Sequence, residues 1–250
     1  MCIRDRLGHD PRVRLQSAVD YINSNYSDSS YCIISGDLVN HGTMDDYKAL
    51  RSKLNKLEIP FLTMVGNHDD RSCLRCVLPL PDNCMEHFIQ YSVSVGDCLI
   101  ICLVTQKTGA DEGEFCSERY TWLREVLENA KEKKVTIFMH HPPMELGLPM
   151  QDAIRMENGF AFLEFLSDFK CVSYLFIGHV HRLVSGTVNG IPFATMRSVL
   201  YQAQAPRPDW NWSTFKPAEE APNLGVISIT DSAVCLQYLQ FCQYESGIGS

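Results

Sequence analysis

Apolar and polar positions alternate along this chain in blocks that predict strands and helices in turn. Apolar runs of about four to eight residues predict buried strands, and longer stretches with apolar residues at helical spacing predict amphipathic helices. Helices are predicted at 13–26, 43–57, 117–133 and 158–169. Strands are predicted at 31–34, 61–65, 89–95, 98–104, 135–139, 172–177, 182–188, 191–194, 224–230 and 233–239. This alternation indicates one α/β domain, with 203–223 as its longest irregular segment.

Four short polar clusters each follow one of the predicted strands. They are Gly36-Asp37, Gly66 to Asp69, His140 to Pro143 and Gly178 to His181. Because open α/β sheets bind ligands at the carboxyl ends of their strands, we expect the four clusters to converge. Imidazole and carboxylate groups suit Mn, Fe, Co or Zn, and a carboxylate can bridge two ions. The pattern therefore predicts a site for two divalent metal ions that hydrolyses phosphate esters.

The composition of the chain limits its partners. The 250 residues carry a formal net charge of −8, with 45% apolar and 21% charged residues. Nucleic-acid phosphates are neutralised by clustered lysine and arginine, so this acidic chain is expected to bind no nucleic acid. No apolar run approaches the roughly 18 residues that a membrane helix needs, which predicts a soluble, globular protein without a membrane partner. A small anionic substrate remains compatible with this charge, because metal ions would supply the positive field.

The cysteine content indicates a cellular compartment, and the first six residues differ from the rest of the chain. Eleven cysteines, several of them inside predicted strands, are typical of a reducing compartment and predict a cytoplasmic protein. Residues 1–6 match no predicted element and lack the character of a signal peptide. We interpret them as translated adapter sequence joined to a truncated reading frame, and we expect 7–250 to form a single native domain.

In their order along the chain, the four clusters resemble motifs of the calcineurin-like metallophosphoesterases, whose pattern is DxH, GD, GNH(D/E), an isolated His and GHxH. Asp10 to Arg12, Asp69 to Arg71 and Met139 to Pro143 resemble one branch of that family. The branch holds the bacterial cyclic-nucleotide phosphodiesterases and the related glycerophosphodiesterases. The resemblance covers nearly the whole chain and implies a four-layer α/β/β/α sandwich that cleaves phosphoric esters.

The resemblance also implies roles for five metal ligands. Asp37 would bridge both ions, and Asn67, His140 and His179 would complete the shell of the second metal. His181 would bind the first metal, and a metal-bridging hydroxide would attack the phosphorus in line. Side chains alternate with period two on an extended segment, so a His-x-His pair placed there would direct both rings to one side.

Three residues of the clusters are expected to meet the substrate. By the same resemblance, His68 would face the scissile phosphate as a proton donor or as a stabiliser of developing charge, and Asn67 would contact the substrate. His141 would contact the substrate or fill space behind the ligands, and both readings stay open. Taken singly, Asp37 and Asn67 are also ordinary turn residues, whereas Asp69 is expected to cap the short helix that follows it.

The DxH motif is the part of the family pattern that this sequence lacks. Asp5 and His9 have the wrong spacing, and His9 to Arg12 resemble the segment that follows the family's first strand. We therefore expect that about twenty residues, with the first strand and two ligands, are missing. The chain as written is expected to be weakly active or inactive and of low stability.

The substrate is expected to be a small phosphodiester, either cyclic AMP or a glycerophosphodiester. Trp210, Trp212 and Phe215 would form a lid that stacks on a base, or would pack a loop against the sheet. A phosphomonoesterase, a protein phosphatase and a metal-free binding module are the alternatives. A homodimer or a higher homo-oligomer is left open.

Overall fold

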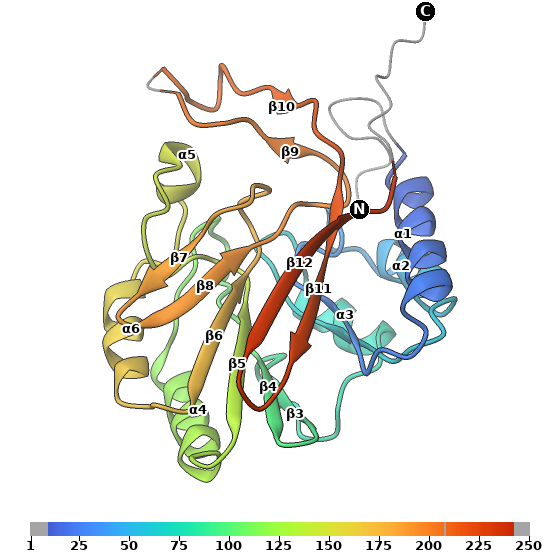
Figure 1. Ribbon diagram of the computed structural model, residues 1–250. Coiled ribbons are helices and arrows are strands. Elements are labelled where there is room, and N and C mark those ends of the chain that lie inside the picture. Colours follow the sequence, from blue (N-terminus) through green and yellow to red (C-terminus); the bar gives the residue numbers. More distant parts are fainter. Residues whose placement is uncertain (1–9, 208, 243–250) are drawn as a thin grey trace, which may run out of the picture.

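The computed structural model describes residues 10–207 and 209–242, so the interpretation of residues 1–6 lies outside the described part of the chain. That part forms an α/β fold (Figure 1). Its helices are α1 (Pro11–Asn25), α2 (Met44–Leu54), α3 (Arg71–Val77), α4 (Ser117–Asn129), α5 (Pro149–Asp152) and α6 (Gly159–Ser167). Its strands are β1 (Cys32–Ile34), β2 (Phe61–Thr63), β3 (Tyr91–Val95), β4 (Cys98–Cys102), β5 (Lys134–Met139), β6 (Val172–Ile177), β7 (Ser185–Val188), β8 (Ile191–Thr195), β9 (Gln202–Ala203), β10 (Pro217–Ala218), β11 (Asn223–Ile229) and β12 (Val234–Gln240).

A six-stranded mixed sheet in the order β3-β4-β5-β6-β8-β7 forms the centre of the fold. Strands β4, β5, β6 and β8 run parallel, and the edge strands β3 and β7 pair antiparallel with their neighbours. Three two-stranded ladders accompany this sheet in the described part of the chain: β1 pairs parallel with β2, and β9-β10 and β11-β12 are antiparallel pairs. The predicted hairpin at Gly96-Asp97 is confirmed by the β3-β4 pairing.

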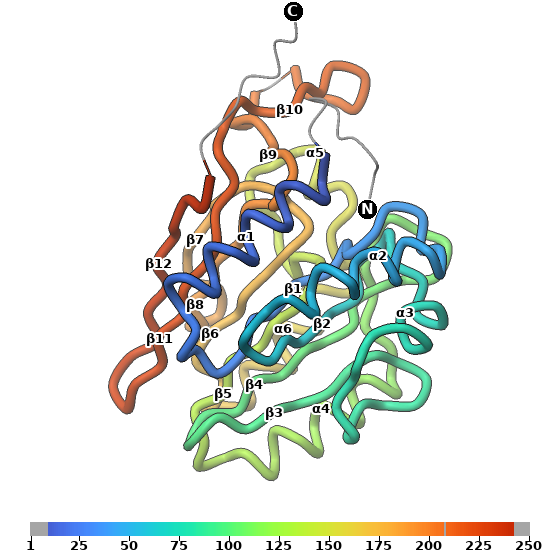
Figure 2. Tube along the Cα trace, turned by 90° about the vertical axis from the view of Figure 1, so that its right-hand side faces the viewer, coloured from blue at the N-terminus to red at the C-terminus, as the bar shows by residue number. Residues whose placement is uncertain are grey.

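Side chains of the central sheet alternate between two hydrophobic cores on its opposite faces, as the period of a strand requires. On β4, Leu99 and Ile101 belong to the core that also includes α4 and α6. The intervening Ile100 belongs to the core formed with α2, α3 and β2, against which Ile227 of β11 also packs. The layers therefore run helices, sheet, strands, helices, and the expected α/β/β/α architecture is confirmed (Figures 1 and 2).

Several predicted boundaries differ from the structure. The helices predicted at 43–57 and 117–133 end earlier, at Leu54 and Asn129. The segment 203–223 is less irregular than predicted, because β9 and β10 pair there through two residue pairs. The pattern predicts neither this ladder nor the four-residue helix α5, since such short elements span less than one hydrophobic period.

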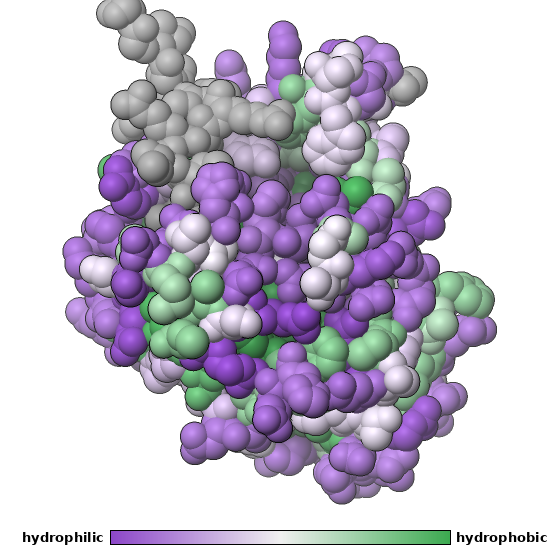
Figure 3. Space-filling view, turned by 180° about the vertical axis from the view of Figure 1, so that it is seen from behind, coloured by the Kyte–Doolittle hydropathy of each residue, from purple (hydrophilic) through white to green (hydrophobic). Residues whose placement is uncertain are grey.

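The described residues on the face of the molecule drawn in Figure 3 form no large continuous apolar patch. Hydrophilic side chains predominate there, and apolar side chains lie in small separate groups. None of the helices in the described part of the chain combines the length and the apolar character needed to cross a bilayer.

Candidate metal centre

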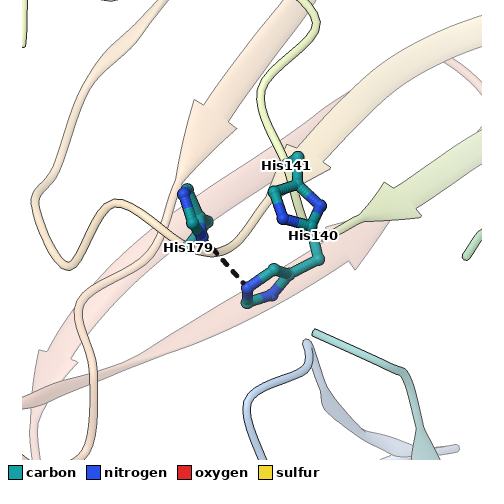
Figure 4. A group of neighbouring side chains, drawn as sticks. All are labelled: His140, His141 and His179. Carbon is teal, nitrogen blue, oxygen red and sulfur yellow. Dashed lines mark hydrogen bonds between the residues drawn. The ribbon is translucent and has the colours of Figure 1, made fainter. Parts of the chain in front are cut away.

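The four polar clusters follow the carboxyl ends of four strands, as predicted. Gly36-Asp37 follows β1, Gly66 to Asp69 follow β2, and the clusters that begin at His140 and Gly178 follow β5 and β6. Because β1-β2 and β5-β6 are parallel pairs, each pair brings two clusters to one edge. The two edges meet, since His140 Nε2 lies 3.3 Å from Asp37 Oδ2. The same nitrogen lies 3.3 Å from Nδ1 of His179, which follows the neighbouring strand β6 (Figure 4).

Two glycines allow the loops to approach this closely. Gly36 has a φ of +98°, and a Cβ atom placed there would lie 2.5 Å from His140 Nδ1. A Cβ atom at Gly66 would lie 2.1 Å from Asp37 Oδ1. No side chain fits at either position, so the site requires both glycines.

The tautomer of His140 follows from its hydrogen bond to the backbone. Its Nδ1 lies 2.8 Å from the carbonyl oxygen of Ser35, which can only accept, so Nδ1 carries the hydrogen. Nε2 is therefore the ring nitrogen that faces Asp37 and His179. Burial lowers the pKa of His140, but the Asp37 carboxylate outweighs it and the net pKa is raised. Burial conversely raises the pKa of Asp37, and His140 reverses this to a net lowering.

Two buried atoms near this pair test whether the residues fit a metal ion. Within the described residues, Asn67 Oδ1 and His179 Nε2 are buried without a hydrogen-bond partner. An unsatisfied buried polar atom costs about 1–3 kcal/mol, so each calls for a ligand. Burial, followed by the charge of His140, lowers the pKa of His179 to about 3, which keeps this imidazole neutral at neutral pH. A neutral imidazole, an amide oxygen and a carboxylate together fit a divalent cation.

The GHxH segment differs from the extended geometry predicted for it. His179 and His181 have positive φ values of 68° and 51°, so the pair occupies a tight turn after β6 and the prediction of an extended segment is wrong. Left-handed backbone at non-glycine residues costs of order 1–3 kcal/mol and is typical of ligand sites. The His181 ring lies 4.7 Å from the Tyr201 ring, and burial lowers the pKa of His181 to about 4.

His68 lies at the open side of the cluster. Its backbone N–H donates to Asp37 Oδ1 at 3.1 Å, while the residue itself is exposed. A side chain that meets a substrate needs this combination of a fixed backbone and an accessible ring. Its catalytic role stays a prediction.

His141 lies behind the ligands, with both ring nitrogens engaged. Nε2 lies 3.1 Å from the carbonyl oxygen of Asp111 and must donate to it, so Nδ1 accepts from Thr105 Oγ1 at 2.8 Å. His141 is fully buried, and burial followed by the charge of His140 lowers its pKa well below the usual value. One ring nitrogen of His141 lies within 4.8 Å of a nitrogen of His140 and of His179, but both nitrogens of His141 are engaged by these hydrogen bonds. The predicted substrate contact stays a prediction.

Asp69 does not cap helix α3, contrary to the sequence prediction. Asp70 is the N-cap residue, and its side chain accepts from the Cys73 N–H at 2.7 Å. Asp69 is only 6% exposed and accepts hydrogen bonds from both loops of the site. Burial, followed by the charge of Asp37, raises the pKa of the Asp69 carboxyl to about 6.

Sequence reasoning missed a set of supporting residues after β4. Thr105 binds His141, and Gln106 Nε2 donates to the carbonyl oxygens of Gly66 and Asp69 at 3.1 and 2.6 Å. Asp111 Oδ1 lies 3.5 Å from Asn67 Nδ2. Asp111 therefore contacts the amide nitrogen of Asn67 and leaves its unpartnered oxygen Oδ1 available. Thr105 and Gln106 follow a strand end just as the four clusters do, and that position is the signal that could have identified them.

Comparisons with known proteins agree with this geometry. The family model described as calcineurin-like phosphoesterase matches residues 9–183. A protein named as a probable cyclic nucleotide phosphodiesterase of Rhodopseudomonas palustris is 35% identical over 198 residues, which cover 78% of this chain and 72% of that protein. The glycerophosphodiester phosphodiesterase GpdQ of Enterobacter lignolyticus is 30% identical over 190 residues, 72% of this chain and 68% of that protein.

Two solved structures share the fold at low sequence identity. A dimetal phosphatase from Danio rerio superposes with a TM-score of 0.62 at 15% identity, covering 76% of this chain and 78% of that one. A purple acid phosphatase from yellow lupin seeds gives a TM-score of 0.72 at 12% identity, covering 94% of this chain and 48% of that one.

Proposed function

Because this chain belongs to the calcineurin-like phosphoesterase family of dinuclear metal hydrolases that act on phosphoric esters, we propose that it hydrolyses a small phosphodiester. The proposal rests on one observation above all. Asn67 Oδ1 and His179 Nε2 are buried without a partner within the described residues, beside the Asp37–His140 pair. These atoms would serve as ligands, and the relatives named for cyclic nucleotides and glycerophosphodiesters support a diester as the substrate.

The chain's own side chains divide the work of the site. Asp37 would hold both ions, Asn67, His140 and His179 one of them, and His181 the other. When bound, Mn, Fe, Zn or Co ions would supply the positive charge that an acidic chain lacks and would activate water. His68 would deliver a proton to the leaving oxygen, because it is exposed while its backbone is fixed to Asp37.

Substrate choice rests on four aromatic residues of the β9-β10 region, which we name the aromatic arm: Tyr201, Trp210, Trp212 and Phe215. The Tyr201 ring lies beside His181 and 6.3 Å from the Phe215 ring. Trp212 is 54% exposed and 6.2 Å from Phe215, whereas Trp210 is buried and packs inward. Trp210 therefore packs the arm against the fold, and the exposed Trp212 would stack on the base of a nucleotide diester, which favours a cyclic nucleotide over a glycerophosphodiester.

The compartment and the partners follow from composition. Nine cysteines between Cys32 and Cys235 are free thiols, which supports a reducing environment and therefore the cytoplasm. The net charge of −8 disfavours nucleic acid as a partner. A small phosphodiester remains the partner that the site favours.

Hydrolysis of para-nitrophenyl esters tests the proposal directly. The 250-residue chain is loaded with Mn²⁺ and assayed on bis-para-nitrophenyl phosphate and on the monoester. Faster cleavage of the diester is expected, whereas faster cleavage of the monoester would favour the phosphatase alternatives. No cleavage of either ester would refute the function.

Two histidine variants locate the chemistry within the site. His68→Ala should lower turnover by about a hundredfold or more while metal content is unchanged, as for other acid-base groups. His87→Ala is the matched control, because His87 is an exposed histidine that pairs with Glu118 at 3.1 Å. Unchanged turnover of His68→Ala would remove His68 from the mechanism.

A further inference from the structure

The Asp69 carboxylate joins the two loops that carry the proposed ligands. Its Oδ1 accepts from the N–H groups of Leu38 and Val39 at 3.1 and 3.3 Å. Its Oδ2 accepts from Leu38 N–H at 3.1 Å and from Gly66 N–H at 2.9 Å. Leu38 directly follows Asp37 and Gly66 directly precedes Asn67, so the carboxylate bonds to the immediate neighbours of two ligands.

Helix α2 holds this carboxylate through one buried tyrosine. The Tyr47 hydroxyl donates to Asp69 Oδ1 at 2.9 Å and accepts from the Asp70 N–H at 2.9 Å. Tyr47 is fully buried. From the other side, Gln106 donates to the carbonyl oxygen of Asp69 and restrains its backbone. Asp69 is thus held by two residues that bind no metal themselves, Tyr47 at its carboxylate and Gln106 at its backbone.

We infer that Asp69, held by Tyr47, is a positioning residue that sets the separation of the Asp37 carboxylate and the Asn67 amide. This inference rests on the proposed metal site. Only a carboxylate can accept from four donors on both of its oxygens, because an amide would direct its own N–H groups at backbone N–H groups. Ligand sites tolerate displacements of only about 0.5 Å, so loss of this link should weaken cation binding.

Metal affinity measured on the metal-free protein tests this role. The variants are Asp69→Asn and Tyr47→Phe, and the matched control is Asp70→Asn, which changes the adjacent, exposed carboxylate that only caps α3. Mn²⁺ affinity is measured by isothermal titration calorimetry, folding by urea denaturation and turnover on bis-para-nitrophenyl phosphate. We expect Asp69→Asn to lower Mn²⁺ affinity about 10-fold to 100-fold, as for other groups that orient ligands, and Tyr47→Phe to lower it less.

Asp70→Asn should leave Mn²⁺ affinity unchanged, and it should leave stability nearly unchanged because asparagine caps a helix about as well as aspartate. A folded Asp69→Asn variant with wild-type affinity would overturn the inference. If that variant does not fold, Tyr47→Phe decides, because it removes a single oxygen, and wild-type affinity there overturns the inference as well. A wild-type chain that binds Mn²⁺ but cleaves no ester would refute the proposed function alone, and the affinities would still decide the role of Asp69.

Discussion

Replacing the buried Arg119 by methionine should destabilise the protein strongly, although arginine is rarely found fully buried in proteins. The side chain of Arg119 is fully buried in α4. Its Nη1 donates to the carbonyl oxygens of Val104 and Gln106 at 2.9 and 3.2 Å. Nη2 donates to Glu114 at 3.2 Å, and the guanidinium lies 4.6 Å from the centre of the Phe88 ring.

The expected magnitude follows from these contacts. Methionine keeps the apolar stem but leaves the two buried carbonyls without a donor, at a cost of about 1–3 kcal/mol each. The lost stacking on Phe88 adds about 1–2 kcal/mol. The Glu114 side chain is 41% exposed, so water can solvate its carboxylate when Arg119 is replaced. Removal of the buried positive charge of Arg119 also offsets part of the lost stability. The free energy of unfolding should fall by about 3–5 kcal/mol, a large share of the 5–15 kcal/mol that is typical of native proteins.

Urea denaturation followed by circular dichroism measures this difference. Arg124→Met is the control, because Arg124 lies on the exposed side of the same helix, 4.8 Å above the Phe165 ring. Its loss should cost no more than about 1 kcal/mol. An Arg119→Met variant within about 0.5 kcal/mol of the wild type, the range of ordinary surface substitutions, would refute the assignment of these hydrogen bonds as stabilising.

Three further predictions use other parts of the structure. Gly66→Ala should lower Mn²⁺ affinity at least about tenfold in calorimetry, because its Cβ would lie 2.1 Å from Asp37 Oδ1. Gly96→Ala is the control and should leave the affinity unchanged, because its Cβ would meet no atom within 4 Å. Equal affinities of the two variants would contradict the close approach at Gly66. Asp10 caps α1, and its hydrogen bond from Arg12 lowers its pKa to about 2 from 3.8. Asp10→Ala should therefore lower the melting temperature at neutral pH, with a difference that disappears as pH falls from about 4 to about 2; a difference that persists at pH 2 would contradict this. Removal of metal by a chelator should abolish hydrolysis, and Mn²⁺ at a hundredfold excess over its Kd should raise the free energy of unfolding by about 2.7 kcal/mol; hydrolysis that survives chelation would contradict the metal site.

The sequence predicts the strands and the positions of the candidate ligands because both carry local signals, whereas the four layers were expected from the family resemblance. Strand β6 matches its prediction at both ends, and β3-β4 pair at the predicted turn. Asp37, Asn67 and His179 each follow a glycine within a few residues of a strand end, and His140 directly follows β5. A strand followed by glycine and a ligand is a pattern that a short window of sequence contains.

The sequence does not separate Asp69 from Asp70, since adjacent carboxylates before a helix have equal local propensity to cap it. Tyr47 decides the matter from 22 residues away by binding Asp69 Oδ1. Tight turns at non-glycine residues are equally invisible, which is why His179 and His181 were expected on an extended segment. In both cases, contacts with distant residues override the local preference.

The supporting hydrogen bonds of the site connect residues that lie far apart in the chain. Gln106 reaches Gly66 across 40 residues, and Thr105 reaches His141 across 36. Arg119 fixes the carbonyl of Gln106 itself, so its loss should loosen both supports together. Arg119 binds neither metal nor substrate, yet its replacement by methionine should then reduce metal affinity as well as stability. The two effects would separate if the loop after β4 kept its geometry without Arg119, and a destabilised variant with full Mn²⁺ affinity would show that.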